Sequence, residues 1–266
     1  MSHIRLDIAY NGLEYLGFQS QPHGNTIQDL LELCLHQHFG MEVRITSASR
    51  TDAGVSAEHQ VVTFPFSASL DLSAFVGSFN HLLPPAIRVK KAYVAEAGFH
   101  PSYSSIGKIY RYRIWKGQCH NPFVRDFVWE NFRGAELDRL AEMMSFFIGK
   151  HDFRAFAHLG TDQKSTVRKI YDVKVEDLST HFNIWILGSG FLKQMVRIMV
   201  GTSVDQALGR LAKPISEIIL ELDRNQAGRT APANGLCLVK IIYDEIPNLL
   251  DFIQQYNEKA TLTVNC

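Results

Sequence analysis

The sequence has few cysteines, no long apolar run and no excess of charge of either sign. Four cysteines are scattered among 266 residues without a C-x-x-C pair, so we expect neither a zinc ribbon nor a disulfide scaffold. Such cysteines suit a reducing compartment, and we expect a cytoplasmic protein. No stretch reaches the roughly 18 apolar residues of a membrane span. The first residues, MSHIRLDIAYNG, lack the apolar core of a signal peptide, so we expect neither membrane insertion nor secretion.

Several common catalytic motifs are also absent. The chain has no G-x-x-x-x-G-K-[ST] phosphate loop, no G-x-G-x-x-G turn after a strand, no G-x-S-x-G turn and no H-E-x-x-H metal motif. His36 and His38 are two apart on a predicted helix, so they point to different faces and make a poor metal pair. We therefore expect no cofactor and no metal.

The charges balance over the whole chain but not along it. Lysine plus arginine and aspartate plus glutamate each number 27, yet residues 107–213 carry 17 basic and 11 acidic side chains, while both flanking segments are acidic. Within this basic segment, residues 108–116 (KIYRYRIWK) alternate cations and aromatic rings at strand spacing. Such a strand could stack bases and hold the phosphates of a nucleic acid, although an ordinary amphipathic strand with one solvated face has the same pattern.

The apolar pattern predicts strands and helices in mixed order. Period-two runs predict strands at 4–10, 43–48, 60–66, 87–94, 108–115, 167–175, 183–188 and 236–243. Helical spacing predicts helices at 26–39, capped by Asn25, and at 72–82, 137–148, 191–208 and 215–222. Because strands arrive in pairs between helices, we expect an α+β fold with a largely antiparallel sheet. We expect two domains, an N-terminal half over 1–106 and a C-terminal half over 107–266.

Two short segments carry residues that could do chemistry. In the turn 49–55 (SRTDAGV), between two predicted strands, Asp52 could cap the turn and Gly54 could supply a positive φ. In the predicted helix 191–208, Arg197 is embedded among apolar residues, where a cation is costly unless a carboxylate pairs with it. Arg197 could instead reach solvent or pair locally. The helix nevertheless favours an acidic partner from elsewhere in the chain.

These segments, in this order, resemble the tRNA pseudouridine synthase A family. Residues 50–55 (RTDAGV) resemble the family's catalytic loop, and residues 108–112 (KIYRY) are similar to its K-x-Y-x-Y strand. Further matches run almost from end to end, at 10–12 (YNG), 17–22 (GFQSQP), 80–84 (NHLLP), 149–153 (GKHDF), 191–202 (FLKQMVRIMVGT) and 231–236 (APANGL). One such match would be weak, but the ordered set identifies the resemblance.

The chain departs from the family pattern at three places. The glycine that usually precedes Arg-Thr-Asp is Ser49, and the histidine that commonly follows Ala-Gly-Val is Ser56. The family's Phe-His-Ala-Arg becomes Phe99-His100-Pro101-Ser102, so an expected cation is missing at Ser102. The residues of the chemistry are kept, and the choice of tRNA and of the position modified is left open.

The resemblance implies a fold, an activity and partners. The fold would be two ferredoxin-like halves that share a central, mostly antiparallel sheet flanked by helices, with the active-site cleft between the halves. The activity would be isomerisation of uridine to pseudouridine in the anticodon stem-loop of tRNA, at tRNA positions 38, 39 and 40, by a homodimer. The isomerisation conserves all atoms and needs no electron carrier, in keeping with the missing cofactor motifs.

The same resemblance implies roles for individual residues. Asp52 would be the nucleophile, attacking C1′ of the ribose or C6 of the base, and Arg197 would pair with it and favour its charged form. Tyr110 would stack on the flipped uracil and serve as, or position, the base that removes the C5 proton. Tyr112 would point to the other face and pack, and Arg50 would fill the space left by the flipped nucleotide. Phosphate contacts are expected from Lys108, Arg111 and Lys193.

Two other functions fit parts of the pattern. A catalytically silent tRNA-binding protein on the same fold would not need Asp52, Tyr110 and Arg197 together, so the intact set favours an enzyme. A hydrolase acting on a glycosidic bond would need a second positioned carboxylate, for which Asp152 is the only candidate. The resemblance gives Asp152 a structural role instead.

Overall fold

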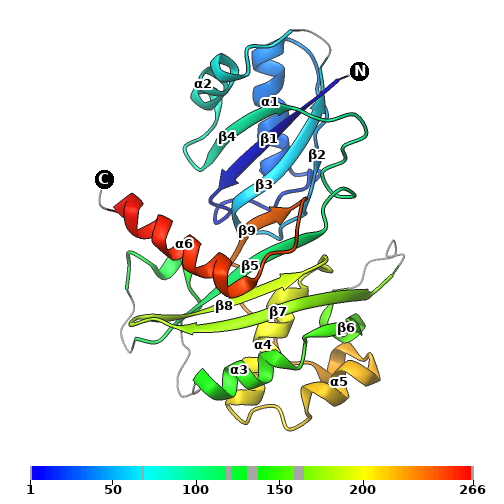
Figure 1. The fold of residues 1–266 in the computed structure, drawn as a ribbon, viewed down its shortest axis with the longest axis vertical. Helices are drawn as coiled ribbons and strands as arrows, with labels where there is room; N and C mark the ends of the chain where they lie inside the picture. Colours follow the sequence, from blue (N-terminus) through cyan, green and yellow to red (C-terminus); the bar gives the residue numbers. More distant parts are fainter. Residues whose placement is uncertain (1, 67–68, 118–120, 131–136, 159–164, 265–266) are drawn as a thin grey trace.

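One sheet contains strands from both predicted halves of the chain (Figure 1). The structure, a computed structural model, describes residues 2–66, 69–117, 121–130, 137–158 and 165–264. The strands are β1 (His3–Tyr10), β2 (Thr46–Ser47), β3 (Ser56–Pro65), β4 (Ile87–Val94), β5 (Gly107–Trp115), β6 (Gly149–Asp152), β7 (Val167–Asp177), β8 (His181–Gly188) and β9 (Leu236–Ile242). Their order in the sheet is β4-β1-β3-β9-β5-β8-β7-β6, with β2 paired to β3.

The two halves meet in this sheet where β3 lies beside β9. The β3–β9 pair is parallel and short, joining Ser56 to Cys237 and Ala57 to Leu238. The other strand pairs are antiparallel, including β1 with β3 and with β4, β5 with β8 and with β9, and β7 with β6 and with β8. The expected α+β fold with a mostly antiparallel sheet is therefore confirmed.

Helices cover both faces of the sheet. They are α1 (Ile27–Phe39), α2 (Leu72–Leu82), α3 (Leu137–Ser145), α4 (Met195–Ala207), α5 (Ile215–Glu221) and α6 (Leu249–Val264). One buried cluster joins the sheet to each of α1 to α5, through Leu31, Phe75, Leu140, Val196 and Ile218. A second cluster, on the opposite face, joins Leu249 and Ile253 of α6 to Ile109 and Trp185, and Figure 1 shows α6 crossing in front of the sheet. Among the described residues, no helix is long and apolar enough to cross a membrane.

Several predicted boundaries were wrong. Helix α1 is capped by Thr26, whose side chain accepts a hydrogen bond from the Asp29 N–H, because Asn25 takes a left-handed backbone with φ of 56°. The predicted strand 43–48 shrinks to β2, which pairs with β3 only through Thr46 and Ser47. The short β6 and the long α6 were not predicted. Cys34 and Cys237 are free thiols, and the other two cysteines lie outside the described residues.

Candidate active site

Asp52 and Arg197, 145 residues apart in the chain, form an ion pair. Arg197 Nη1 donates to Asp52 Oδ2 over 3.1 Å, and Arg197 Nε donates to the carbonyl oxygen of Ala231 over 2.8 Å. The side chains are mostly buried, with 14% of Arg197 and 18% of Asp52 exposed. The acidic partner that the helix requires is thus Asp52, and the guanidinium is held at two points.

Arg197 lies in the first turn of α4. The helix begins at Met195, later than predicted, because Gln194 takes a left-handed backbone with φ of 61°. A cation near the N-terminal end of a helix is unfavourable, whereas a carboxylate there is stabilised, so Asp52 compensates for the charge of Arg197. A Cβ on Gly201 would lie 2.0 Å from the carbonyl oxygen of Arg229, which shows how closely the 229–231 segment packs on α4. This close packing places the carbonyl of Ala231 against Arg197.

The loop that carries Asp52 is held by the segment that follows β1. Gly54 has the positive φ expected from the sequence, 79°, and its N–H donates to the carbonyl oxygen of Tyr15 over 3.2 Å. A Cβ on Gly12 would lie 2.0 Å from the carbonyl oxygen of Val55, so this approach requires glycine. The Val55 N–H donates to the backbone carbonyl of Asp52 over 3.1 Å, and not to its carboxylate. The carboxylate can therefore pair with Arg197.

Tyr110 lies on β5 beside this loop. Its Oη is 3.1 Å from Ser49 Oγ, and its ring meets that of Phe191 edge to face at 5.0 Å between centroids. The side chain is buried, with 6% exposed. Burial, together with the negative charge of Asp52, raises the pKa of Tyr110 to about 12. The phenol is therefore neutral at physiological pH.

Tyr112 packs, as predicted, but on the same face of the sheet as Tyr110. Its Oη donates to the carbonyl oxygen of Pro232 over 2.8 Å, and the side chain is fully buried. The expectation that it points to the other face was wrong, because residues two apart on a strand share a face.

Arg111 lies on the opposite face of the sheet, beneath α6. It is 4% exposed, donates to Glu58 Oε1 over 2.8 Å and also hydrogen-bonds to Tyr256. The expected phosphate contact does not fit this position, because the guanidinium is already paired and covered. Arg111 instead ties β5 to β3 and α6.

The other three cations expected to contact RNA lie in different environments. Lys108 Nζ donates to the carbonyl oxygen of Ala48 over 2.8 Å, and burial, with the charge of Arg168, lowers the pKa of Lys108 to about 8. The structure therefore gives Lys108 an internal hydrogen-bond partner, and its contact with a phosphate stays a prediction. Arg50 and Lys193 are exposed, and their side chains pair with no described residue.

Asp152 does not supply a second carboxylate to this site. It ends β6, the last strand in the sheet order, where its side chain accepts a hydrogen bond from the Arg154 N–H over 3.0 Å. The described residues also contain no cluster of three or more histidine, cysteine, aspartate or glutamate side chains that could hold a metal ion. Of the predicted catalytic residues, the structure brings together one carboxylate, one guanidinium and one phenol.

Two of the three departures from the family pattern, Ser56 and Ser49, use their hydroxyls in the structure. Ser56 Oγ accepts a hydrogen bond from the Gly12 N–H over 3.0 Å, which ties the start of β3 to the segment after β1. Ser49 Oγ lies within hydrogen-bond distance of Tyr110 Oη. Ser102 instead donates its backbone N–H to His100 Nδ1 over 3.2 Å, a hydrogen bond that does not depend on the serine side chain. Sequence reasoning missed the Ser49 and Ala231 contacts, because a turn serine and a backbone carbonyl carry no distinctive side-chain signal.

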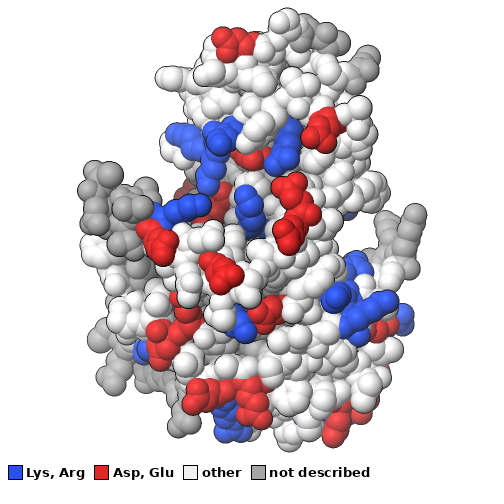
Figure 2. All heavy atoms as spheres, viewed as in Figure 1, with Lys and Arg blue, Asp and Glu red and all other residues white. Residues whose placement is uncertain are grey.

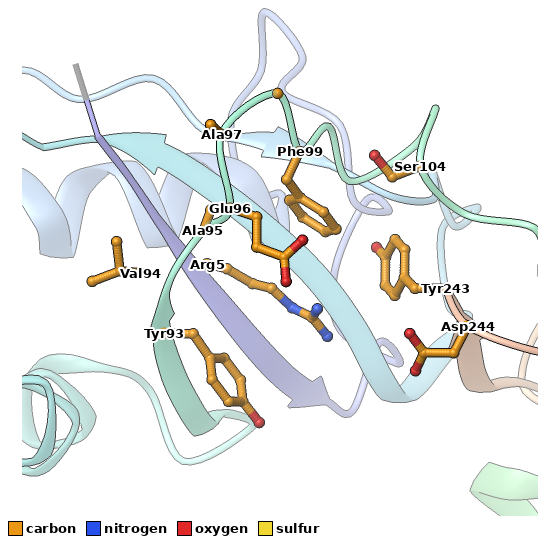
Figure 3. A pocket seen from close by; sticks show the side chains of 11 residues that line it. Arg5, Tyr93, Val94, Ala95, Glu96, Ala97, Phe99, Ser104, Tyr243 and Asp244 are labelled. Carbon is orange, nitrogen blue, oxygen red and sulfur yellow. The ribbon is translucent and has the colours of Figure 1, made fainter.

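The face that carries α6 does not contain this site. Figure 2 shows lysine and arginine interspersed with aspartate and glutamate on that face, without one continuous basic patch. A hollow of about 410 Å³ also opens there, where Arg5 lies among the rings of Tyr93, Phe99 and Tyr243 (Figure 3). Arg5 points away from α1, since Ile4 and Leu6 on either side of it belong to the cluster beneath the helices. None of the three catalytic candidates lines this hollow.

Comparison with known proteins gives consistent results. A family model described as tRNA pseudouridine synthase matches residues 143–244. The chain is 38% identical over 246 residues to tRNA pseudouridine synthase A of Syntrophotalea carbinolica, covering 91% of this chain and 97% of that protein. It is 39% identical over 244 residues to tRNA pseudouridine synthase A of Pelobacter propionicus, covering 91% and 100%.

Solved structures give a more distant likeness. A chain in the crystal structure of a Cbf5–Nop10–Gar1 complex is 13% identical, with a TM-score of 0.36, over 94% of this chain and 54% of that one. The sequence identity to the curated relatives, which extends over nearly their whole length, is the stronger result. This chain belongs to the tRNA pseudouridine synthase A family, a family of isomerases.

Proposed function

We propose that this protein is a tRNA pseudouridine synthase that acts on uridine at positions 38, 39 and 40 of the anticodon stem-loop. Membership of the family supports the reaction and the tRNA substrate. The observation that carries the proposal is the Asp52–Arg197 pair beside Tyr110. A carboxylate held by a cation from a distant helix, next to a buried aromatic ring, is suited to attack a nucleoside that stacks on the ring.

The reaction is an isomerisation in which Asp52 forms a temporary covalent bond. The bond between N1 of uracil and C1′ of the ribose breaks, and a bond between C5 and C1′ replaces it. Asp52 gives an electron pair to C1′ or to C6 and recovers it when the covalent intermediate breaks down. C5 loses a proton and N1 gains one, so uridine and pseudouridine have the same composition and no oxidant or reductant is consumed.

Arg197 and Tyr110 position the reacting groups. Arg197 is held by Ala231 as well as by Asp52, so it fixes the direction in which the carboxylate points. Tyr110 is neutral at physiological pH, since its pKa is about 12. A neutral phenol can stack on uracil and hydrogen-bond to it, which favours a positioning role over proton removal by a phenolate.

The uridine must leave its stacked position in the RNA before it reaches Asp52. Extrusion of a base costs a few kcal/mol, and a side chain that fills the vacated space reduces that cost. Arg50, exposed, unpaired among the described residues and two positions before Asp52, is suited to that task. Lys193, also exposed and four positions before Arg197, is suited to hold a phosphate.

The homodimer and the cytoplasmic location are part of the same proposal. A single chain has no net charge, but residues 107–213 carry more basic than acidic side chains. A homodimer would present two such segments to one RNA, which would strengthen the attraction of its phosphates. Light scattering of the purified protein, alone and with tRNA, measures the number of copies.

Mapping of pseudouridine in unmodified tRNA transcripts tests the proposed function. A transcript with uridine at 38, 39 and 40 should gain pseudouridine at those positions when incubated with the protein, and a matched transcript with cytidine there should gain none. Asp52→Asn should bind the first transcript and leave it unmodified. Modification elsewhere in the tRNA would refute the assignment of position. Binding by the wild-type protein without any pseudouridine would instead indicate a silent tRNA-binding protein.

A further inference from the structure

Ser49 contacts Tyr110 from the turn that leads into the loop carrying Asp52. Its Oγ lies 3.1 Å from Tyr110 Oη, and either hydroxyl can donate. Both side chains are buried, so water does not compete freely for this hydrogen bond. Ser49 stands where the family pattern has glycine, and the hydroxyl is therefore a feature of this chain.

The backbone around Ser49 is fixed from two sides. Gln60, fully buried on β3, accepts a hydrogen bond from the Ser49 N–H over 3.1 Å and donates to the Ser49 carbonyl oxygen over 2.6 Å. Lys108, two residues before Tyr110 on β5, donates to the carbonyl oxygen of Ala48 over 2.8 Å. Because β3 and β5 both hold this segment, the Ser49 hydroxyl is a fixed partner for the phenol.

We propose that Ser49 is a positioning residue for the isomerisation, whose hydroxyl fixes the phenol oxygen of Tyr110 relative to Asp52 and to the incoming uracil. This inference rests on the function proposed above. Phe191 restrains the ring of Tyr110, so the Ser49 hydroxyl sets the position of its oxygen end. Among the described residues, Ser49 is the hydrogen-bond partner found for the Tyr110 hydroxyl. A buried hydroxyl that loses such a partner seeks another, and a small displacement of a positioned group lowers the rate of reaction.

The first test separates turnover from binding. Ser49→Ala removes one oxygen atom, and we expect kcat on tRNA to fall about five- to tenfold while KM changes by less than about twofold. Ser203→Ala is the matched control, because Ser203 is fully buried and its hydroxyl has no partner in the described part of the chain. The control should leave kcat and KM unchanged. If Ser49→Ala does not fold, Ser49→Gly removes the same hydroxyl.

The second test asks whether Ser49 acts through Tyr110. In single-turnover assays with excess enzyme, Ser49→Ala should have no further effect in a Tyr110→Phe background, because the hydroxyl partner is already gone. An equal loss of rate in both backgrounds would overturn the inference, as would an unchanged kcat for Ser49→Ala. An inactive wild-type protein would refute the proposed function itself, which distinguishes the two failures.

Discussion

Replacing Arg197 with methionine removes the cation from a mostly buried ion pair. Two hydrogen bonds are lost, one of 3.1 Å to Asp52 and one of 2.8 Å to the Ala231 carbonyl. Methionine has a long, adaptable apolar side chain, so the space beside α4 stays filled. The variant therefore isolates the charge and its hydrogen bonds from the packing of the helix.

Exposure of the pair sets the size of the effect. Removal of one partner from a fully buried pair costs about 3–5 kcal/mol. Because 18% of the Asp52 side chain is exposed, water partly solvates the remaining carboxylate, and we expect a loss of about 2–3 kcal/mol in the free energy of unfolding. The carboxylate also loses its fixed direction, so kcat/KM on tRNA should fall by about 100-fold or more.

Urea unfolding of four proteins measures the pair directly: the wild type, Arg197→Met, Asp52→Asn and the double variant. Removal of both charges costs less than removal of one, so the double variant should be more stable than Arg197→Met, by about 1 kcal/mol. Additive losses of stability, or an Arg197→Met protein that unfolds like the wild type and keeps its activity, would refute the reasoning.

Three further predictions concern Tyr110, Lys108 and Gly12. Tyr110→Phe should keep its affinity for tRNA and lower the single-turnover rate by about 100-fold; a near-normal rate would leave Tyr110 only a packing role. The pKa of Lys108 is about 8 in the folded protein against 10.5 when unperturbed, so the unfolded chain binds more protons between these values. The free energy of unfolding should therefore rise between about pH 8 and pH 10.5, by at most about 3 kcal/mol more in the wild type than in Lys108→Met. If the free energy of unfolding changes with pH in the same way in both proteins, this linkage is excluded. Gly12→Ala should lower both stability and activity, since its Cβ would lie 2.0 Å from the Val55 carbonyl oxygen. As a control, Gly77→Ala in α2 places its Cβ in open space and should stabilise the protein by about 1 kcal/mol. Equal unfolding midpoints for the two alanine variants would contradict that account.

Local sequence patterns predicted correctly the bounds of those helices and strands whose ends are set by nearby residues in the chain. Helix α2 and strand β4 have the predicted bounds, because the apolar spacing and the ends of each lie within the segment itself. The predicted strand 43–48 was too long, because the length of β2 depends on how far it pairs with β3. Helix α6 was not predicted, and its buried face is defined only by contact with distant strands, at Ile109 and Trp185.

The site shows the same division between local and distant information. The need of Arg197 for an acidic partner could be read from its apolar neighbours, but only the family resemblance indicated Asp52, 145 residues away. The expected phosphate contact at Arg111 failed because that side chain alternates away from Tyr110 and lies under α6. The hydrogen bond between Ser49 and Tyr110 could not be predicted, because it depends on how β5 meets a turn 61 residues earlier.

Release of tritium from tRNA labelled at C5 of uridine tests most directly whether Asp52 is the nucleophile. C5 must lose its hydrogen when it bonds to C1′, so the wild-type protein should release tritium in step with pseudouridine formation. Asp52→Asn should release none while binding tRNA with a Kd within about twofold of the wild type. Undiminished tritium release from Asp52→Asn would contradict the account.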